Sequence, residues 1–233
     1  MSESAHSRPS LRAVIFDMDG VLVDTMPLHA RAWIETLARE GIPVSREDVY
    51  AREGQAGDES LAFFLARAGR NPAAERREAL LRRKEIRFRE IAGIRVFPGA
   101  EELLADLTRR GLRLGLVTGT AERELAAVLP DGLRRRFAAV VTGDQVRRGK
   151  PDPEPYRTAL ARLGVDSGEA VVVENAPLGV RSARAAGIRC LAVETSVACP
   201  HLAGAEACYP NLSALARALT AELDRGDPRP SCV

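Results

Sequence analysis

Three aspartates lie close together in the sequence VIFDMDGVLVDT, which spans residues 14–25. Asp17 and Asp19 directly follow an apolar run that is typical of a buried strand, and Asp24 follows shortly after them. Carboxylates placed this near to one another repel unless a cation or a proton offsets their charge. Their chemistry includes nucleophilic attack, proton transfer and the binding of Mg²⁺ through oxygen atoms. The stretch is therefore a candidate catalytic centre.

Three other polar motifs occupy equivalent positions further along the chain. Each follows an apolar segment typical of a strand, and they are Thr118-Gly119-Thr120, Lys150-Pro151-Asp152 and Glu174-Asn175. Ligands of an open parallel sheet bind beyond the carboxyl ends of its strands. One such motif could be an ordinary cap or turn, but four at matching strand ends indicate an active site.

The elements that would position these motifs alternate between strands and helices. The spacing predicts strands at 11–16, 112–118, 138–143, 170–175 and 189–193, separated by helices at about 100–110, 121–128, 154–163 and 178–186, with a last helix at 212–224. This order predicts an α/β fold, a doubly wound Rossmann-like parallel sheet covered on both faces.

The segment after the first motif has a different pattern. From 25 to 94 the apolar spacing is helical and no convincing strand occurs, so we expect an all-helical cap domain inserted after the first strand. The core domain would then comprise 11–24 and 95–225. We expect the terminal segments 1–10 and 226–233 to be disordered tails.

The bulk composition excludes several classes of protein. The formal net charge of +2 is too small to call for nucleic acid or an anionic membrane surface. No apolar run approaches the roughly 20 residues of a transmembrane helix, and the polar N-terminus lacks a signal segment. We therefore expect a cytoplasmic protein with no nucleic-acid or membrane partner, whose four cysteines are reduced thiols. A metal cluster of Cys199, His201 and Cys208 is the alternative, but no CxxC pair occurs and zinc sites usually have tighter paired spacing.

The motifs DMDGVLVDT, VTGT, KPDP and VVEN, in this order, resemble the four motifs of the haloacid dehalogenase (HAD) superfamily. The helical segment after the first motif resembles the cap of its subfamily of β-phosphoglucomutases and phosphoglycolate phosphatases. The resemblance covers nearly the whole chain. It implies a HAD-like hydrolase that acts on phosphate esters with Mg²⁺ as cofactor.

The resemblance also implies roles for individual residues. Asp17 would attack phosphorus and form an aspartyl-phosphate, and Asp19 would act as general acid and base. Thr118 would bind the phosphoryl oxygens, together with the backbone at Gly119 and Thr120. Lys150 would neutralise charge beside Asp17.

Lysine usage supports the assignment of Lys150 independently. Of the 34 basic residues, only Lys84 and Lys150 are lysines. A chain that uses arginine almost everywhere keeps lysine where a compact ammonium is needed.

The metal ligands implied by the resemblance are Asp17, the backbone carbonyl of Asp19, and Asn175 with Glu174 beside it. The commoner family form has an aspartate at position 175, so this chain removes one negative charge from the site. We expect Mg²⁺ to bind, but more weakly than with an aspartate at this position unless Glu174 compensates. Either Glu174 or Asn175 could be the direct ligand. Gly20 allows the sharp turn at the substrate site.

The cap would exclude water and select the substrate. His29 and Trp33 lie on a helix that resembles the first cap helix of β-phosphoglucomutases, although both could be packing residues. Arg52 and Gln55 lie in REGQAGDES (52–60), which matches the substrate-specificity loop in position. The mutases commonly have an arginine in this loop where the present chain has Gly57.

These observations favour a Mg²⁺-dependent phosphatase that acts on a small phosphorylated metabolite, such as a sugar phosphate or phosphoglycolate. A β-phosphoglucomutase-type mutase is the alternative, since Arg52 could supply a second phosphate site. A catalytically degenerate HAD-fold binding module is a weaker one. We expect a monomer or a weak homodimer.

Overall fold

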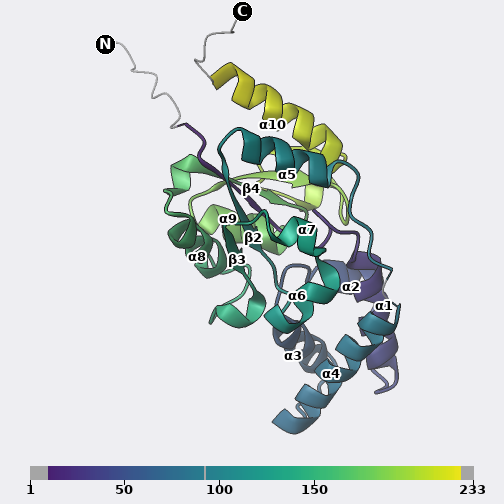
Figure 1. Ribbon diagram of the computed structural model, residues 1–233. Helices are drawn as coiled ribbons and strands as arrows, with labels where there is room; N and C mark the ends of the chain where they lie inside the picture. The colour runs from purple at the N-terminus through teal and green to yellow at the C-terminus, as the bar shows by residue number, and fades with distance from the viewer. Residues whose placement is uncertain (1–9, 92, 227–233) are drawn as a thin grey trace, which may run out of the picture.

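The computed structural model describes residues 10–91 and 93–226, so most of the two tails expected at 1–10 and 226–233 lies outside the described residues. Figure 1 shows a sheet flanked by helices, with a separate group of helices beyond one end of the strands. The elements are, in chain order, β1 (Ala13–Phe16), α1 (Met26–Ala38), α2 (Arg46–Tyr50), α3 (Gly57–Arg67), α4 (Ala74–Ile91), α5 (Ala100–Arg109), β2 (Arg113–Val117), α6 (Glu122–Val128), α7 (Asp131–Arg134), β3 (Ala139–Val141), η1 (Gly143–Gln145), α8 (Glu154–Leu163), η2 (Ser167–Glu169), β4 (Ala170–Glu174), α9 (Pro177–Ala185), β5 (Arg189–Val193), η3 (Cys199–His201), β6 (Ala207–Tyr209) and α10 (Leu212–Gly226).

The sheet confirms the expected fold class. Its strand order is β3-β2-β1-β4-β5-β6, and every paired strand is parallel. The chain leaves β1 toward β2 and β3, then crosses to β4 on the other side, so the order reverses between β1 and β4. Such a switch point opens a crevice at the carboxyl ends of the two strands.

Alternate residues of β1 pack into different layers. Val14 and Phe16 belong to a core cluster that also holds residues of α5, α6 and α10. Ala13 and Ile15 belong to a second cluster, shared with residues of α8 and α9. Because successive side chains of a strand point to opposite faces, the apolar run buries both faces of the sheet between helices.

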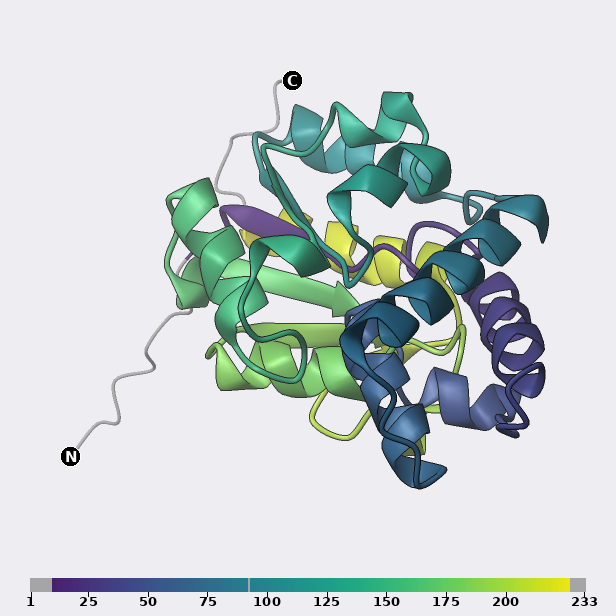
Figure 2. The same cartoon turned by 90° about the horizontal axis from the view of Figure 1, so that it is seen from below.

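Helices α1 to α4 form the group beyond the sheet. Figure 2 shows them, purple to blue, on one side of the strands. They have an apolar cluster of their own, in which Trp33 packs edge-on against Phe64 at 5.6 Å between ring centroids. We propose the boundaries expected above, a cap of residues 25–94 and a core of 11–24 with 95–225, and use these names below.

Two features near the C-terminus differ from expectation. The short edge strand β6 was not expected, since three residues are too few to show alternation. The expectation that all cysteines are reduced thiols is wrong for Cys199 and Cys208, which form a disulfide, whereas Cys190 is a free buried thiol and Cys232 lies outside the described residues. Cys199 is the first residue of η3 and Cys208 lies in the unexpected strand β6.

No helix in the described part of the chain is long and apolar enough to cross a membrane.

Candidate active site

The first four strands bring the polar motifs together at one edge of the sheet. Asp17 directly follows β1, Thr118 directly follows β2, Lys150 lies in the loop between β3 and α8, and Glu174 ends β4. Strand pairing fixes their relative positions, because the backbone N–H of Asp17 still donates to Val173 on β4, at 2.9 Å. All four side chains are buried.

Lys150 lies between two carboxylates at the floor of the site. Its Nζ is 2.5 Å from Oδ1 of Asp17, 2.7 Å from Oε1 of Glu174 and 3.2 Å from the carbonyl oxygen of Val117. Burial alone would lower the pKa of Lys150, but the two carboxylates raise it. Burial raises the pKa of Asp17 to about 8, with the attraction of Lys150 acting against it and the charge of Glu174 adding to it.

The carboxylate of Glu174 is fully engaged by the core. Besides Lys150, it accepts hydrogen bonds from the hydroxyl of Tyr156 at 2.8 Å and from the backbone N–H groups of Asn175 and Ala176 at 2.9 and 3.0 Å. Glu174 therefore holds Lys150 in place and turns the chain at the end of β4. Tyr156 was missed in the sequence, where a tyrosine inside an amphipathic helix reads as ordinary core.

The carboxylate of Asp19 is hydrogen-bonded by side chains of both the cap and the core. Its Oδ1 accepts from Thr25 at 2.5 Å and lies 3.2 Å from Nε2 of His29, while Oδ2 accepts from Thr120 at 3.1 Å and Thr118 at 3.3 Å. Burial acts to raise the pKa of Asp19, but these hydrogen bonds, led by that of His29, lower it to about 2. The sequence prediction missed Thr25.

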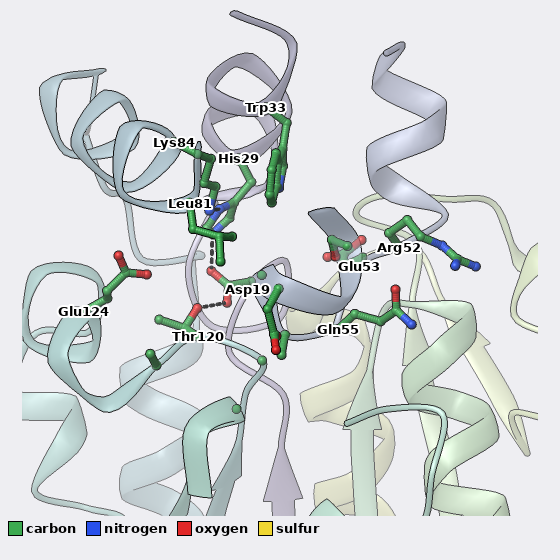
Figure 3. Close-up of a pocket in the computed structure, with 18 of the residues that line it drawn as sticks. Asp19, His29, Trp33, Arg52, Glu53, Gln55, Leu81, Lys84, Thr120 and Glu124 are labelled. Carbon is green, nitrogen blue, oxygen red and sulfur yellow. Dashed lines mark hydrogen bonds and ion pairs between the residues drawn. The ribbon is translucent and has the colours of Figure 1, made fainter. Parts of the chain in front are cut away.

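His29 connects Asp19 to a buried lysine of the cap. Lys84, on α4, lies with Nζ 3.0 Å from Nδ1 of His29 and 5.4 Å from the ring centre of Trp33 (Figure 3). An ammonium has only hydrogens to donate, so Nδ1 accepts and Nε2 keeps the hydrogen that it donates to Asp19. Burial and the charge of Lys84 lower the pKa of His29, which favours this neutral ring. Lys84 was missed, although its rarity was the same signal that supported Lys150.

The cap closes over these residues and leaves a cavity of about 360 Å³. Trp33, Arg52 and Gln55 contribute to its wall. Figure 3 shows the side chain of Arg52 directed away from Asp19, and its guanidinium lies 4.1 Å from the ring centre of Phe63. Arg52 is therefore at the margin of the cavity.

Two glycines let the cap loop touch the core. A Cβ on Gly119 would lie 2.5 Å from the carbonyl oxygen of Gln55, so a side chain there would separate the two domains. Gly20 has φ +78° and a Cβ on it would lie 1.9 Å from Nδ2 of Asn175 and 2.7 Å from Oε1 of Glu53. Only glycine adopts this backbone cheaply and leaves room for both groups.

Asn175 and Glu53 face each other across the domain boundary. Nδ2 of Asn175 donates to Oε1 of Glu53 at 2.5 Å and to Oγ of Ser196 at 2.9 Å. Burial raises the pKa of Glu53 well above its usual range, and the negative charge of Asp17 adds to the shift. Glu53 was missed, although it stands in the loop from which Arg52 and Gln55 were chosen.

The donor set at this edge suits Mg²⁺. Among the described residues, no group of three or more His, Cys, Asp or Glu side chains has metal-site geometry, but Mg²⁺ is typically held by one or two carboxylates, with water and substrate phosphate completing the octahedron. The side-chain oxygen of Asn175 is buried and has no hydrogen-bond partner, so it is free to bind a cation. The carboxylate of Glu174 is occupied by its four donors.

We expect Lys84→Met to lower kcat by roughly a hundredfold, the lower end of the range typical of general acid–base catalysis. Without the ammonium, the ring of His29 is no longer fixed to donate to Asp19. Steady-state kinetics with p-nitrophenyl phosphate would measure the change, which should fall on kcat more than on KM. The matched control is Arg83→Met, which removes a neighbouring cation that pairs with Glu40 instead. Equal effects of the two substitutions would contradict the role of Lys84.

Comparisons with known proteins identify the family of the chain. Residues 11–187 match the family model described as haloacid dehalogenase-like hydrolase. The chain is 35% identical to phosphoglycolate phosphatase of Rhodospirillum rubrum, over 76% of this chain and 77% of the relative. It is 36% identical to hexitol phosphatase A of Escherichia coli, over 82% and 87%. A solved structure of a putative beta-phosphoglucomutase from Bacteroides vulgatus superimposes with a TM-score of 0.84 at 34% identity, covering 94% of this chain and 91% of the other.

Proposed function

The chain belongs to the haloacid dehalogenase-like hydrolases, and we propose that it is a Mg²⁺-dependent phosphatase that hydrolyses a small phosphorylated metabolite through an aspartyl-phosphate. The observation that carries this proposal is the buried contact of 2.5 Å between Asp17 and Lys150 beside the cavity. Relatives named as phosphatases of phosphoglycolate and hexitol phosphates support the substrate class. We further propose that the protein is cytoplasmic and acts as a monomer or weak homodimer.

In this mechanism the carboxylate of Asp17 attacks phosphorus and displaces the alcohol of the substrate. Lys150 offsets the negative charge that Asp17 and the phosphoryl group bring together. The hydroxyl of Thr118, which bonds Asp19 at 3.3 Å, would turn to the phosphoryl oxygens beside Gly119, where the chain leads into α6. Splitting the reaction at the aspartyl-phosphate replaces one difficult step by two easier ones.

Asp19 would transfer the protons in both halves of the reaction. For this it must hold a proton when the ester binds, so the phosphate must raise the pKa that the hydrogen bonds lower in the site without substrate. Asp19 then donates that proton to the departing alcohol and regains one from the water that hydrolyses the aspartyl-phosphate. Thr25, His29 and Thr120 hold its two oxygens toward the cavity. Because His29 is in the cap, the carboxylate is fully positioned only when the cap covers the site.

We propose Asp17, the backbone carbonyl of Asp19 and the side-chain oxygen of Asn175 as metal ligands. Mg²⁺ bound there would neutralise phosphoryl charge and orient the phosphate toward Asp17. The earlier alternative, Glu174 as the direct ligand, has no support in the geometry, because its oxygens accept four hydrogen bonds. Its role would be to anchor Lys150.

A phosphatase is favoured over a mutase by the cap loop. A mutase must hold a second phosphate, and position 57 is glycine where the mutases commonly have arginine. Arg52, the other candidate, stacks on Phe63 at the cavity margin. A phosphate-release screen over sugar phosphates, phosphoglycolate and nucleotides would identify the substrate. The mutase becomes the better description if β-glucose 1-phosphate with a trace of the bisphosphate yields glucose 6-phosphate faster than free phosphate.

A further inference from the structure

Glu53 is a carboxylate of the cap buried inside the catalytic site of the core. It lies in the loop between α2 and α3, and the residue is only 4% exposed. Oε1 accepts hydrogen bonds from Asn175 at 2.5 Å and from Ser196 at 3.2 Å. Oε2 is buried without any hydrogen-bond partner. A buried carboxylate with one unsatisfied oxygen is strongly unfavourable unless something else binds that oxygen.

The side-chain oxygen of Asn175, the residue bonded to Glu53, is also buried without a hydrogen-bond partner. Its Nδ2 makes two hydrogen bonds, whereas Oδ1 is buried and has no partner. The donation from Nδ2 to Glu53 fixes which end of the amide faces the cap. Two oxygens without partners, one from each domain, therefore belong to side chains that are hydrogen-bonded to each other.

A hydrogen bond that only joined the cap to the core would not account for these two unpaired oxygens. If Glu53 were a protonated carboxyl that only held the cap shut, the protonated oxygen would need an acceptor, and the structure gives Oε2 none. If it were ionised, it would need a cation, and no ion pair of Glu53 occurs within residues 10–91 and 93–226. A divalent cation satisfies the second requirement and is already implied by the chemistry of the site.

We propose that Glu53 is a metal ligand contributed by the cap, which replaces the carboxylate that Asn175 lacks. This inference rests on the proposed Mg²⁺-dependent function. The cation would be held by two carboxylates, Asp17 and Glu53, and by two carbonyl oxygens, those of the Asn175 side chain and the Asp19 backbone. Mg²⁺ prefers such an all-oxygen set, with remaining positions left for water and phosphate.

The residues around Asn175 and Glu53 allow the two domains to approach closely at this point. Gly20 leaves the space in which Asn175 and Glu53 approach each other. Ser196, in the loop after β5, hydrogen-bonds both side chains, and the hydroxyl of Thr195 bonds the carbonyl oxygen of Gly20. Because the ligands come from two domains, binding of the metal would favour the covered state of the site.

The test measures Mg²⁺ binding to the whole protein without substrate, by isothermal titration calorimetry. Glu53→Gln keeps the size of the side chain and an oxygen that can accept from Asn175, but removes the charge. We expect it to weaken Mg²⁺ binding by tenfold or more, since even residues outside the ligand set change metal affinity tenfold to a hundredfold. Hydrogen exchange at residues 50–57 should be slowed by Mg²⁺ in the wild type and much less in this variant.

Two further variants test whether Glu53 is a metal ligand or only a structural contact. Glu59→Gln is the matched control, because Glu59 also joins the cap to the core, through the N–H of Gly149 at 3.2 Å; it should leave Mg²⁺ affinity within about twofold. Asn175→Asp supplies a carboxylate from the core, so the double variant with Glu53→Gln should recover most of the lost affinity. This rescue remains informative if Glu53→Gln alone folds poorly.

The outcomes distinguish this inference from the proposed function. If the wild type binds Mg²⁺ and releases phosphate, but Glu53→Gln binds Mg²⁺ equally well, Glu53 is not a ligand and the phosphatase stands. If Asn175→Asp fails to restore affinity to a folded Glu53→Gln protein, the replacement is likewise refuted. A wild type that neither binds Mg²⁺ nor releases phosphate overturns both.

Discussion

Asp17→Asn should abolish phosphatase activity, with kcat falling on the order of 10⁴-fold or more, the scale seen when a nucleophile is removed from an enzyme. The amide has nearly the shape of the carboxylate but is not a nucleophile at phosphorus. It can still accept a hydrogen bond from Lys150, so the variant should fold. Release of p-nitrophenol from p-nitrophenyl phosphate would measure the loss, and circular dichroism would check the fold.

Asp24→Asn provides the matched control for this experiment. Asp24 belongs to the same cluster of carboxylates, but it pairs with Arg95 at 3.0 Å, where the chain enters and leaves the cap. Its loss should change kcat by less than about threefold, since partly exposed ion pairs contribute little. Activity of Asp17→Asn within tenfold of the wild type would exclude Asp17 as the nucleophile and, with it, the aspartyl-phosphate.

Lys150→Met should lower the free energy of unfolding by about 3–5 kcal/mol, the usual cost of removing one partner of a buried ion pair. It leaves Asp17 and Glu174 buried beside each other without a counter-charge, since both are at most 2% exposed. The pKa of Lys150 is raised in the folded state. Its contribution is thus fully present below the pKa of an unfolded lysine, about 10.4, and is lost only as pH rises through the higher folded value, so urea unfolding in neutral buffer with a chelator reports it in full.

Two controls accompany Lys150→Met. Arg148→Met removes an exposed cation two positions earlier and should cost less than about 0.5 kcal/mol, because its ion pair with Asp152 is solvent-screened. Adding Glu174→Gln to Lys150→Met removes one of the two repelling charges and should return part of the stability. A stability of Lys150→Met within 1 kcal/mol of the wild type would show that the pair is not needed to hold the site together.

The part of the site that lies in the core was predictable, because strand geometry determines where its residues lie. Asp17, Thr118 and Glu174 directly follow or end apolar strands, and parallel pairing fixes where such residues meet. Lys150 lies in a longer loop, yet its position after β3 and the scarcity of lysine both indicated it. These signals are local, so one sequence suffices to read them.

The cap half was predicted only in outline. Helical spacing indicated the cap, but which of its side chains reach the site depends on how the loop after α2 sits against Gly20 and Gly119. That placement follows from contacts between distant segments, which no local period encodes. Glu53 was therefore passed over in favour of its neighbours Arg52 and Gln55, and Glu174 alone was considered as compensation for the charge missing at Asn175.

Trp33 gives the cavity an optical reporter. It is the sole tryptophan of the sequence, it lines the cavity, and its ring centre lies 5.4 Å from the ammonium of Lys84. Indole emission responds to nearby charge and to contact with water, and here no second indole contributes background. The intrinsic fluorescence of the unlabelled protein should therefore report events at the domain boundary in real time.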